Sequence, residues 1–324
     1  MKPVYKIDIA SEAPSNLEAD AVLLGIPPDV CFHTLRGLRL PLGVYNVSIQ
    51  RVSEKLIAFC GRLETYMKVS SKIEVLQNAE QIRQELIDYV ELAIYAAAEH
   101  VDDIDSIATG FFRIPKDCER NAAYKELCKE VKRLKRIVAI SANAIKHQQA
   151  RIRLFSVEMA HALQETCLHG YFIEAVENGV IGPSSVLHRN QDCFSLTSLA
   201  WEVITFLLGC SRALCHFLME IGQLKAETVV PNSSLFNSAV IAAARLPLYT
   251  FGEEHPFARA TVQLGASDGI YTPFDSGLYG SIKNRWVDHA TANFGNFRSS
   301  FVGDGVSKTF RFAQPKTIGL SQWS

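Results

Sequence analysis

Two side chains near the end of a predicted helix have the chemistry of an acid–base site. Asn143 and His147 lie four residues apart, and this spacing places both on one face of a helix predicted over residues 117–149. An imidazole exchanges a proton near neutral pH, which suits general acid–base catalysis. The pair is therefore a candidate catalytic site, although a single helical histidine is more often a structural hydrogen-bond partner.

A row of cations leads to this pair along the same predicted helix. Within a sector of about 60°, the helix carries Lys125, Lys129, Lys132 and Arg136. Its opposite side is apolar, with Leu127, Val131, Leu134, Val138 and Ile145. Such a stripe would suit a polyanion such as RNA whose reactive phosphate lies near the histidine. The alternative is a solvated face, because Glu126 and Glu130 offset part of the charge.

The string Ala142-Asn143-Ala144-Ile145-Lys146-His147 resembles the signature of the HEPN family. Members of that family are small helical bundles found in RNA-cleaving toxins, antiviral defence proteins and their inactive relatives. Their signature is an arginine, a polar residue that is often asparagine, three further residues and a histidine, near the end of a long helix. Asn143 and His147 match in spacing, whereas Ala142 stands where the family has its arginine. The resemblance covers about residues 44–221.

The resemblance implies either a metal-independent endoribonuclease or a degenerate relative that binds RNA without cleaving it. In the family, the histidine assists transfer of the 2′-hydroxyl proton and the arginine stabilises the charge of the transition state. Losing a fixed cation at developing charge costs about 100-fold or more in rate. Lys146, Arg151 and Arg153 are near in sequence and are the candidate replacements, so they join the predicted RNA-binding residues. By analogy with the family, a homodimer is expected, with its two His147 side chains near each other.

Two alternative functions use other parts of the chain. A non-enzymatic scaffold would present a β-rich C-terminal region to a protein partner. A serine hydrolase would use Gly265-Ala266-Ser267-Asp268-Gly269, which fits the Gly-x-Ser-x-Gly pattern of a nucleophile elbow. That elbow opens a helix, whereas residues 270–273 have the pattern of a strand and a turn. The segment is therefore predicted to be a Gly-rich β-turn.

No motif in the sequence predicts a metal or another cofactor. His161, Cys167 and His169 offer soft ligands, but they lack the paired short spacing of structural zinc sites. The phosphate-binding and dinucleotide-binding glycine motifs are also missing from the sequence. We therefore expect a protein that works without a cofactor.

The composition predicts a folded intracellular protein without a general affinity for polyanions. The 324 residues are 48% hydrophobic and carry a formal net charge of -1, so any RNA binding requires a local patch. Eight cysteines, none in a Cys-x-x-Cys pair, indicate a reducing compartment such as the cytoplasm. We identify no secretory signal, and charged residues interrupt the most apolar stretch, residues 199–221, which favours a buried core helix over a membrane span.

Hydrophobic periodicity predicts a mainly α protein, a helical bundle with an inserted β-hairpin and a smaller β-rich C-terminal region. Residues 1–43 are expected to form an irregular segment with strands at 4–9 and 21–26. Residues 44–225 are expected to form the bundle, with helices at 44–67, 79–105, 117–149 and 196–221. Asp117 is the predicted N-cap of the third helix, and Asn178-Gly179 is the predicted hairpin turn. Residues 226–324 are expected to be β-rich, with a hairpin over 298–312.

Overall fold

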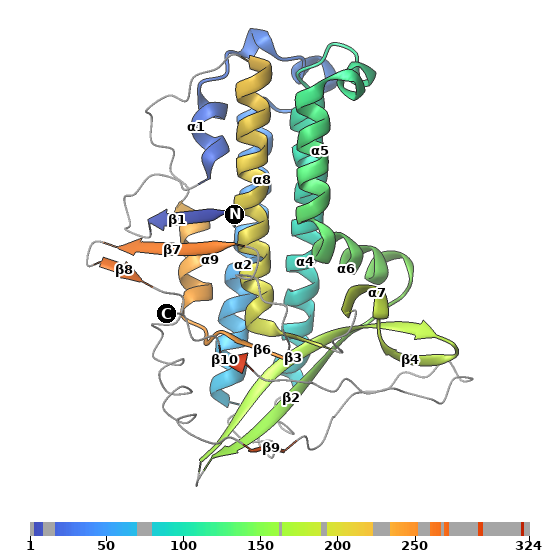
Figure 1. Ribbon diagram of the computed structural model, residues 1–324, viewed down its shortest axis with the longest axis vertical. Coiled ribbons are helices and arrows are strands. Elements are labelled where there is room, and N and C mark those ends of the chain that lie inside the picture. The colour runs from blue at the N-terminus through green and yellow to red at the C-terminus, as the bar shows by residue number, and fades with distance from the viewer. Residues whose placement is uncertain are drawn as a thin grey trace.

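The computed structural model describes residues 3–8, 17–69, 80–161, 164–188, 193–222, 234–251, 260–266, 269–271, 291–293 and 319–320. Within these ranges the chain forms an upright bundle of long helices with a twisted β-hairpin at its lower end (Figure 1). The bundle comprises α2 (Pro41–Val69), α4 (Glu80–Thr109), α5 (Ala122–Leu134) and α8 (Leu196–Gly222). The predicted mainly α fold with an inserted hairpin is confirmed.

Helices α2 and α4 form an antiparallel pair because each carries one apolar stripe. The buried residues of α2 include Val52, Leu56, Phe59 and Leu63, and those of α4 include Leu86, Val90, Ala93 and Ala97. Two ion pairs, Arg62 with Glu85 at 2.6 Å and Arg51 with Glu99 at 2.8 Å, join the helices at their edge. The prediction that the second helix ends at residues 102–105 is wrong. The apolar period continues through buried Ile104 and Ile107, so α4 extends to Thr109.

Helix α8 is the central element of the bundle and packs against α1, α4 and α5. It is long and apolar enough to cross a membrane by length and composition alone. In the structure, 72% of its most apolar stretch is buried inside the protein. This burial agrees with the expectation of a core helix.

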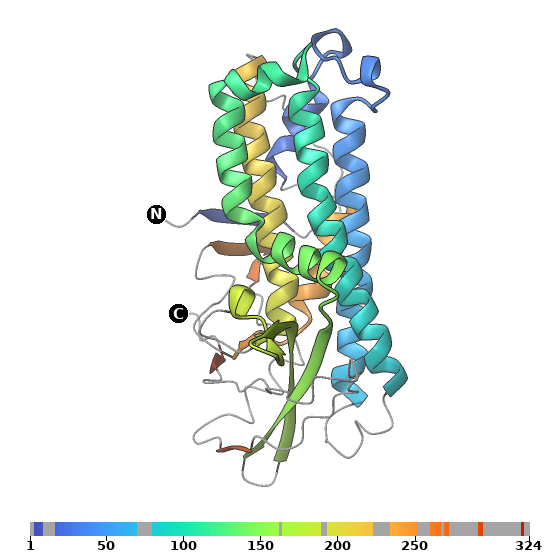
Figure 2. The ribbon, with the colours of Figure 1, turned by 90° about the vertical axis from the view of Figure 1, so that its right-hand side faces the viewer.

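The single helix predicted over residues 117–149 is wrong, because the chain bends twice in that region. Residues Pro115–Arg120 form a 3-10 helix, and α5 begins after Asn121, whose side chain accepts a 3.0 Å hydrogen bond from the backbone N–H of Tyr124. Asn121, rather than Asp117, is therefore the N-cap. A second bend at Lys135 separates α5 from α6 (Arg136–His147), which runs across the bundle (Figure 2).

The bend at Lys135 follows from what the two helices pack against. The apolar face of α5 contacts α8, where Leu134 lies directly over Gly209. The small buried side chains of α6, Ala142 and Ala144, instead face α4. One straight helix does not reach both partners, so tertiary packing overrides the continuous helical pattern.

The inserted β-hairpin is confirmed, and the predicted turn at Asn178-Gly179 joins β3 (Gln164–Glu177) to β4 (Val180–Pro183). The predicted strand before it is β2 (Ile152–His161), which pairs antiparallel with β3 in a longer hairpin. Asn178 and Gly179 both have positive φ, 54° and 74°, which is the requirement of a type I′ turn. Short strands β5 (Phe194–Ser195) and β9 (Thr291–Asn293) pair with β3 and β2 respectively.

The N-terminal segment and the residues after α8 share one hydrophobic core with the bundle. Strand β1 (Val4–Asp8) confirms the first predicted strand and pairs in parallel with β7 (Thr261–Ala266), which continues antiparallel to β8 (Gly269–Tyr271). The strand predicted at 21–26 is wrong, since α1 (Glu18–Leu24) occupies that region. After α8, helix α9 (Ser234–Ala244) packs on α2, and β6 (Tyr249–Thr250) pairs with β10 (Gly319–Leu320). The hairpin predicted over 298–312 lies outside the described residues.

A loop between α1 and α2 closes the C-terminal end of α4. It contains two 3-10 turns, η1 (Pro28–Val30) and η2 (Thr34–Arg36). A nitrogen of the His33 ring lies 3.0 Å from the carbonyl oxygen of Ile107, and the Arg36 guanidinium donates to the carbonyls of Thr109 and Phe112. These contacts satisfy carbonyl groups that a helix end leaves without intrahelical partners.

The loop comes very close to the chain at Gly110, the residue that follows α4. A Cβ atom on Gly110 would lie within 2.6 Å of Cδ2 of His33, so Gly110→Ala forces the ring or the backbone to move. We expect a loss of about 1–3 kcal/mol in the free energy of unfolding, measured by urea denaturation. The matched control is Gly61→Ala in α2, where a Cβ meets nothing within 4 Å. The free energy of unfolding of that variant is expected to rise by about 0.5–1 kcal/mol. Equal changes in the two variants would contradict the close contact between Gly110 and His33.

Candidate functional site

The predicted catalytic pair lies on the outer face of α6. Asn143 and His147 are one helical turn apart and both are exposed, whereas the opposite face of α6 packs against α4 through Val138, Ala142 and Ala144. Figure 2 shows α6 crossing in front of the bundle, so its outer face is directed away from the core. The spacing of the two residues therefore places the imidazole and the amide together at the surface, as the sequence predicts.

The position that the HEPN signature assigns to arginine faces the opposite way. Ala142 is 3% exposed and belongs to the hydrophobic core. An arginine at this position would be directed into the bundle, away from the face that carries Asn143 and His147. The α6 face therefore lacks a cation from this position to stabilise developing negative charge.

The three candidate replacement cations have different surroundings. Lys146 is exposed, and its Nζ lies 4.7 Å from the centre of the Tyr95 ring on α4. Arg151 is exposed near Glu91, a half-buried residue whose pKa is raised by burial and by Asp88, and lowered by Arg151. The prediction that Arg153 belongs to the RNA-binding surface is wrong. Its side chain is only 7% exposed and forms an ion pair with Glu174, so it does not reach the surface.

The cations of α5 are exposed, but they do not continue in one line to His147. Lys125, Lys129 and Lys132 all lie on the outer face of α5, while Arg136 is half-buried beyond the bend at Lys135. Lys129 pairs with Glu126 at 3.0 Å. The predicted single stripe is therefore divided between two helices that run in different directions.

The two helices nevertheless carry a local excess of positive charge. Residues 122–147 contain seven lysines and arginines against two glutamates, within a chain of net charge -1. The two glutamates pair within α5, with Lys129 and Arg133. Among the described residues, no ion pair is made by Lys125, Lys132, Lys135, Arg136 and Lys146. We call these five cations, with Asn143 and His147, the α5–α6 surface.

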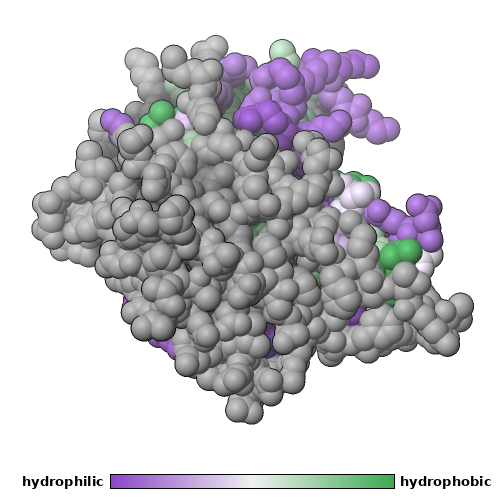
Figure 3. All heavy atoms as spheres, turned by 60° about the horizontal axis from the view of Figure 1, so that its bottom comes forward, coloured by the Kyte–Doolittle hydropathy of each residue, from purple (hydrophilic) through white to green (hydrophobic). Residues whose placement is uncertain are grey.

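The coloured side chains in Figure 3 lie mainly at the upper right of that view and are mostly hydrophilic, with a few hydrophobic ones among them. The described hydrophobic side chains with the greatest exposure near the hairpin are Val176 of β3 and Val186 of α7 (Ser185–His188). Isolated exposed valines are ordinary on protein surfaces, so they do not by themselves mark a site.

The flanks of the serine motif have the geometry of a hairpin. Ser267 and Asp268 lie outside the described residues, but Ala266 of β7 pairs with Gly269 of β8 in an antiparallel register. A nucleophile elbow requires a strand followed by a helix. The strand that follows the motif agrees with the predicted β-turn.

No group of three potential metal ligands gathers within the part of the chain that the structure describes. The side chains of His161 and Cys167 fall outside that part, whereas His169 is buried and lies 2.7 Å from the Ser156 hydroxyl through Nδ1. Cys210 is buried in α8, and burial raises the pKa of its thiol well above the ordinary range. A protonated, buried thiol is a hydrophobic side chain rather than a metal ligand.

One buried histidine with a strongly shifted pKa, His100, was not singled out from the sequence. His100 of α4 is fully buried, and its Nδ1 lies 2.8 Å from the Ser48 hydroxyl of α2. Burial, and to a smaller extent the positive charge of Arg51, lowers the pKa of His100 to about 3. The signal was available, because His100 continues the stripe of Ala93, Ala97 and Ile104.

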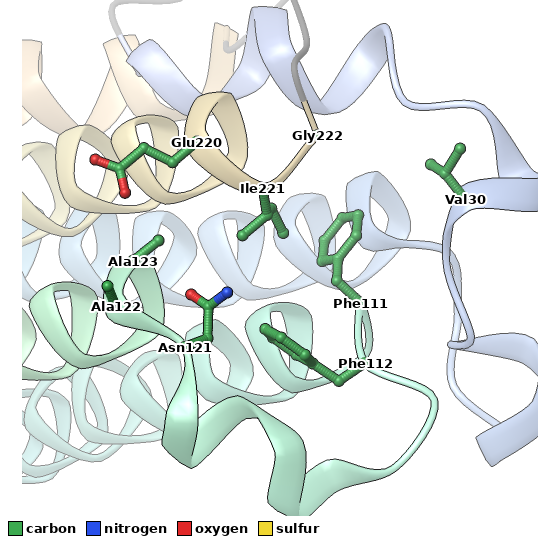
Figure 4. A pocket seen from close by; sticks show the side chains of 9 residues that line it. All are labelled: Val30, Phe111, Phe112, Asn121, Ala122, Ala123, Glu220, Ile221 and Gly222. Carbon is green, nitrogen blue, oxygen red and sulfur yellow. The ribbon is translucent and has the colours of Figure 1, made fainter.

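A cavity of about 550 Å³ opens at the upper end of the bundle, where α8 ends and α5 begins (Figure 4). Phe111 and Phe112 form one end of it and Glu220 lies toward the other, with Ile221 and Asn121 directed into the space between them. This upper-end cavity is well separated from the α6 face near the middle of the bundle (Figure 1).

Comparisons of the chain with protein-family models, with curated proteins and with solved structures gave no match. The functional argument therefore rests on the geometry and charge of the sites themselves. Of the two sites, the α5–α6 surface has the more specific chemistry, because cations without an ion pair among the described residues lie on the same two helices as an exposed imidazole and amide.

Proposed function

We propose that this protein binds RNA through the α5–α6 surface and does not cleave it efficiently, in the manner of a catalytically degenerate HEPN relative. The observation that carries the proposal is the set of five cations without ion pairs among the described residues, on two adjoining helices of a chain with net charge -1. Phosphate groups bound there release counterions, which supplies sequence-independent affinity. Such a role suits a protein of the cytoplasm.

The proposal assigns separate roles to the two parts of the surface. Lys125, Lys132 and Lys146 contact phosphates as point charges, while Asn143 and His147 have side chains suited to hydrogen bonds with a ribose hydroxyl or a phosphate oxygen. Cleavage needs a fixed cation beside the attacked phosphate, and the buried Ala142 supplies none. Binding without efficient turnover is therefore the function that these residues support best.

Removing three cations tests the binding surface. The triple variant Lys125→Gln/Lys132→Gln/Lys146→Gln is expected to bind single-stranded RNA at least about tenfold more weakly at low salt. The slope of log Kd against log salt should fall by about two, since each lost phosphate contact contributes about 0.7. Fluorescence anisotropy with a labelled oligonucleotide, repeated at several salt concentrations, measures both quantities.

The matched control removes the same number of charges elsewhere, through Lys6→Gln/Lys55→Gln/Lys68→Gln on β1 and α2. If both triple variants lose the same affinity, the α5–α6 surface has no special role. A cleavage assay on the same oligonucleotide completes the test. Wild type and His147→Ala are expected to cleave equally slowly, and a clear loss of cleavage in His147→Ala would establish an active ribonuclease instead.

A homodimer with both α6 faces around one cleft belongs to the same proposal. Two copies would double the number of cations that face a single RNA strand. Sedimentation equilibrium of the purified protein measures the mass directly, and a monomer at all concentrations would remove this part of the proposal while leaving the binding prediction intact.

A further inference from the structure

The upper-end cavity has the size and walls of a small-molecule site. Its volume of about 550 Å³ falls within the range of ligand pockets. Phe111 and Phe112, which follow α4, line it together with Ile221 of α8, and Val30 of the closing loop lies farther along (Figure 4). These four side chains provide an aromatic and aliphatic wall for an apolar body.

One end of the cavity is negatively charged. Glu220 is exposed in the last turn of α8, and no described residue forms an ion pair with it. The last turn of α8 contains no basic residue, so the partial negative charge at the end of this 27-residue helix is not offset within the turn. The Glu220 carboxylate and the C-terminal end of α8 therefore both contribute negative potential at this end of the cavity.

The start of α5 lies on the opposite wall and contributes positive potential of smaller size. A helix end carries about half an elementary charge, whereas a carboxylate carries a full one. Asn121 already uses its side-chain oxygen to cap α5, accepting from the Tyr124 N–H. Among the residues that line the cavity, Glu220 is the one with a charged side chain. The lining therefore favours a cation over an anion.

We propose that the upper-end cavity binds a small ligand with a protonated amine on an aromatic or aliphatic body. The amine lies against Glu220 and the C-terminal carbonyls of α8, and the apolar body lies between Phe111, Phe112 and Ile221. Aromatic faces also attract cations, so the phenylalanine wall does not oppose the charge. This site shares no lining residue with the α5–α6 surface, of which Lys125 is the nearest member along α5, and it does not depend on RNA binding.

Matched probes of opposite charge test the inference on the full chain. We expect 2-phenylethylamine to bind at pH 7 with a Kd of about millimolar order, as suits a fragment of its size. The carboxylate 3-phenylpropanoate, of similar shape, is expected to bind at least about threefold more weakly. Two-dimensional NMR titration measures both affinities and locates the perturbed residues.

Two variants connect the affinity to the cavity. Glu220→Gln is expected to weaken amine binding about threefold to fivefold and to remove the preference over the carboxylate. Ile221→Trp, which fills the space between the walls, is expected to abolish binding of both probes. The control Glu54→Gln, at an exposed carboxylate of α2 outside the cavity, should leave both affinities unchanged. Equal or tighter binding of the carboxylate, no binding of the amine, or an unchanged affinity in Glu220→Gln would each overturn the inference.

Discussion

Glu174→Ala is expected to lower the free energy of unfolding by about 3–5 kcal/mol at pH 7, the largest single-residue effect that we predict. Glu174 of β3 and Arg153 of β2 form an ion pair whose side chains are 10% and 7% exposed. Removing the carboxylate takes away a counter-charge that contacts a guanidinium inside the sheet. A buried charge that loses such a partner costs more than the pair contributed, because its lost hydration is not replaced.

Urea denaturation of three variants separates this effect from a general sensitivity of the protein. Glu130→Ala removes one partner of an exposed pair with Arg133 in α5 and should cost less than about 1 kcal/mol. The double variant Arg153→Met/Glu174→Leu removes both buried charges and should recover most of the loss. If Glu174→Ala lowers the free energy of unfolding no more than Glu130→Ala does, the ion pair of Arg153 with Glu174 is not buried.

Acidification is expected to destabilise the protein between about pH 6.5 and pH 3. His100 and His169 are fully buried, and burial lowers the pKa of each to about 3, far below the unfolded value of about 6.5. Above pH 6.5 both states are neutral at these residues, so their contribution to stability is complete. Below pH 6.5 the two histidines bind protons in the unfolded chain but stay neutral in the folded chain. The free energy of unfolding therefore falls by up to about 1.4 kcal/mol per pH unit for each histidine.

The environments of the two rings explain why the folded protein does not accept the proton. His100 contacts the Ser48 hydroxyl and the rings of Tyr45 and Phe206, with Arg51 as the charged residue that lowers its pKa. The ring of His169 lies 4.7 Å from that of Tyr66. Neither shifted pKa has a carboxylate among its causes, and a nearby carboxylate would favour the imidazolium.

Urea denaturation at pH 7, 6 and 5 tests this dependence in a window above the range where carboxylates titrate. His100→Gln and His169→Gln should each reduce the slope of unfolding free energy against pH by about a third to a half in that window, since burial also lowers the pKa of His33. His216→Gln, at an exposed position of α8, is the control and should leave the slope as in wild type. A slope that is insensitive to both buried substitutions would exclude the proposed origin.

The sequence predicts those parts of the fold that depend on local pattern. The long apolar period of α8 and the Asn178-Gly179 turn needed only neighbouring residues, and both are confirmed. The break at Lys135 depends on α5 packing against α8 while α6 packs against α4, which is a property of tertiary structure. For the same reason α1 was predicted as a strand, because a run as short as Glu18–Leu24 fits either pattern.

In the candidate site, too, the sequence predicts what depends on local spacing and does not predict what depends on tertiary packing. Asn143 and His147 share a face of α6 because both belong to one helix, and the spacing alone fixes that relation. Arg153 was expected near the surface with Arg151, since the two are close in sequence. Its burial depends on Glu174, which lies 21 residues later and reaches it only through the pairing of β2 with β3. The direction of Ala142 likewise became clear only from the packing of α6 on α4.

The parallel pairing of β1 with β7 sets an order of events during protein synthesis. Val4 pairs with Thr261, so β1 leaves the ribosome long before β7 and finds its partner only after the helices between them have been translated. Closing so long a loop is entropically costly unless the intervening chain has already folded. Until then the nascent strand is an open edge, and its outward Lys6 is a charge of the kind that discourages association with other chains on the same messenger RNA.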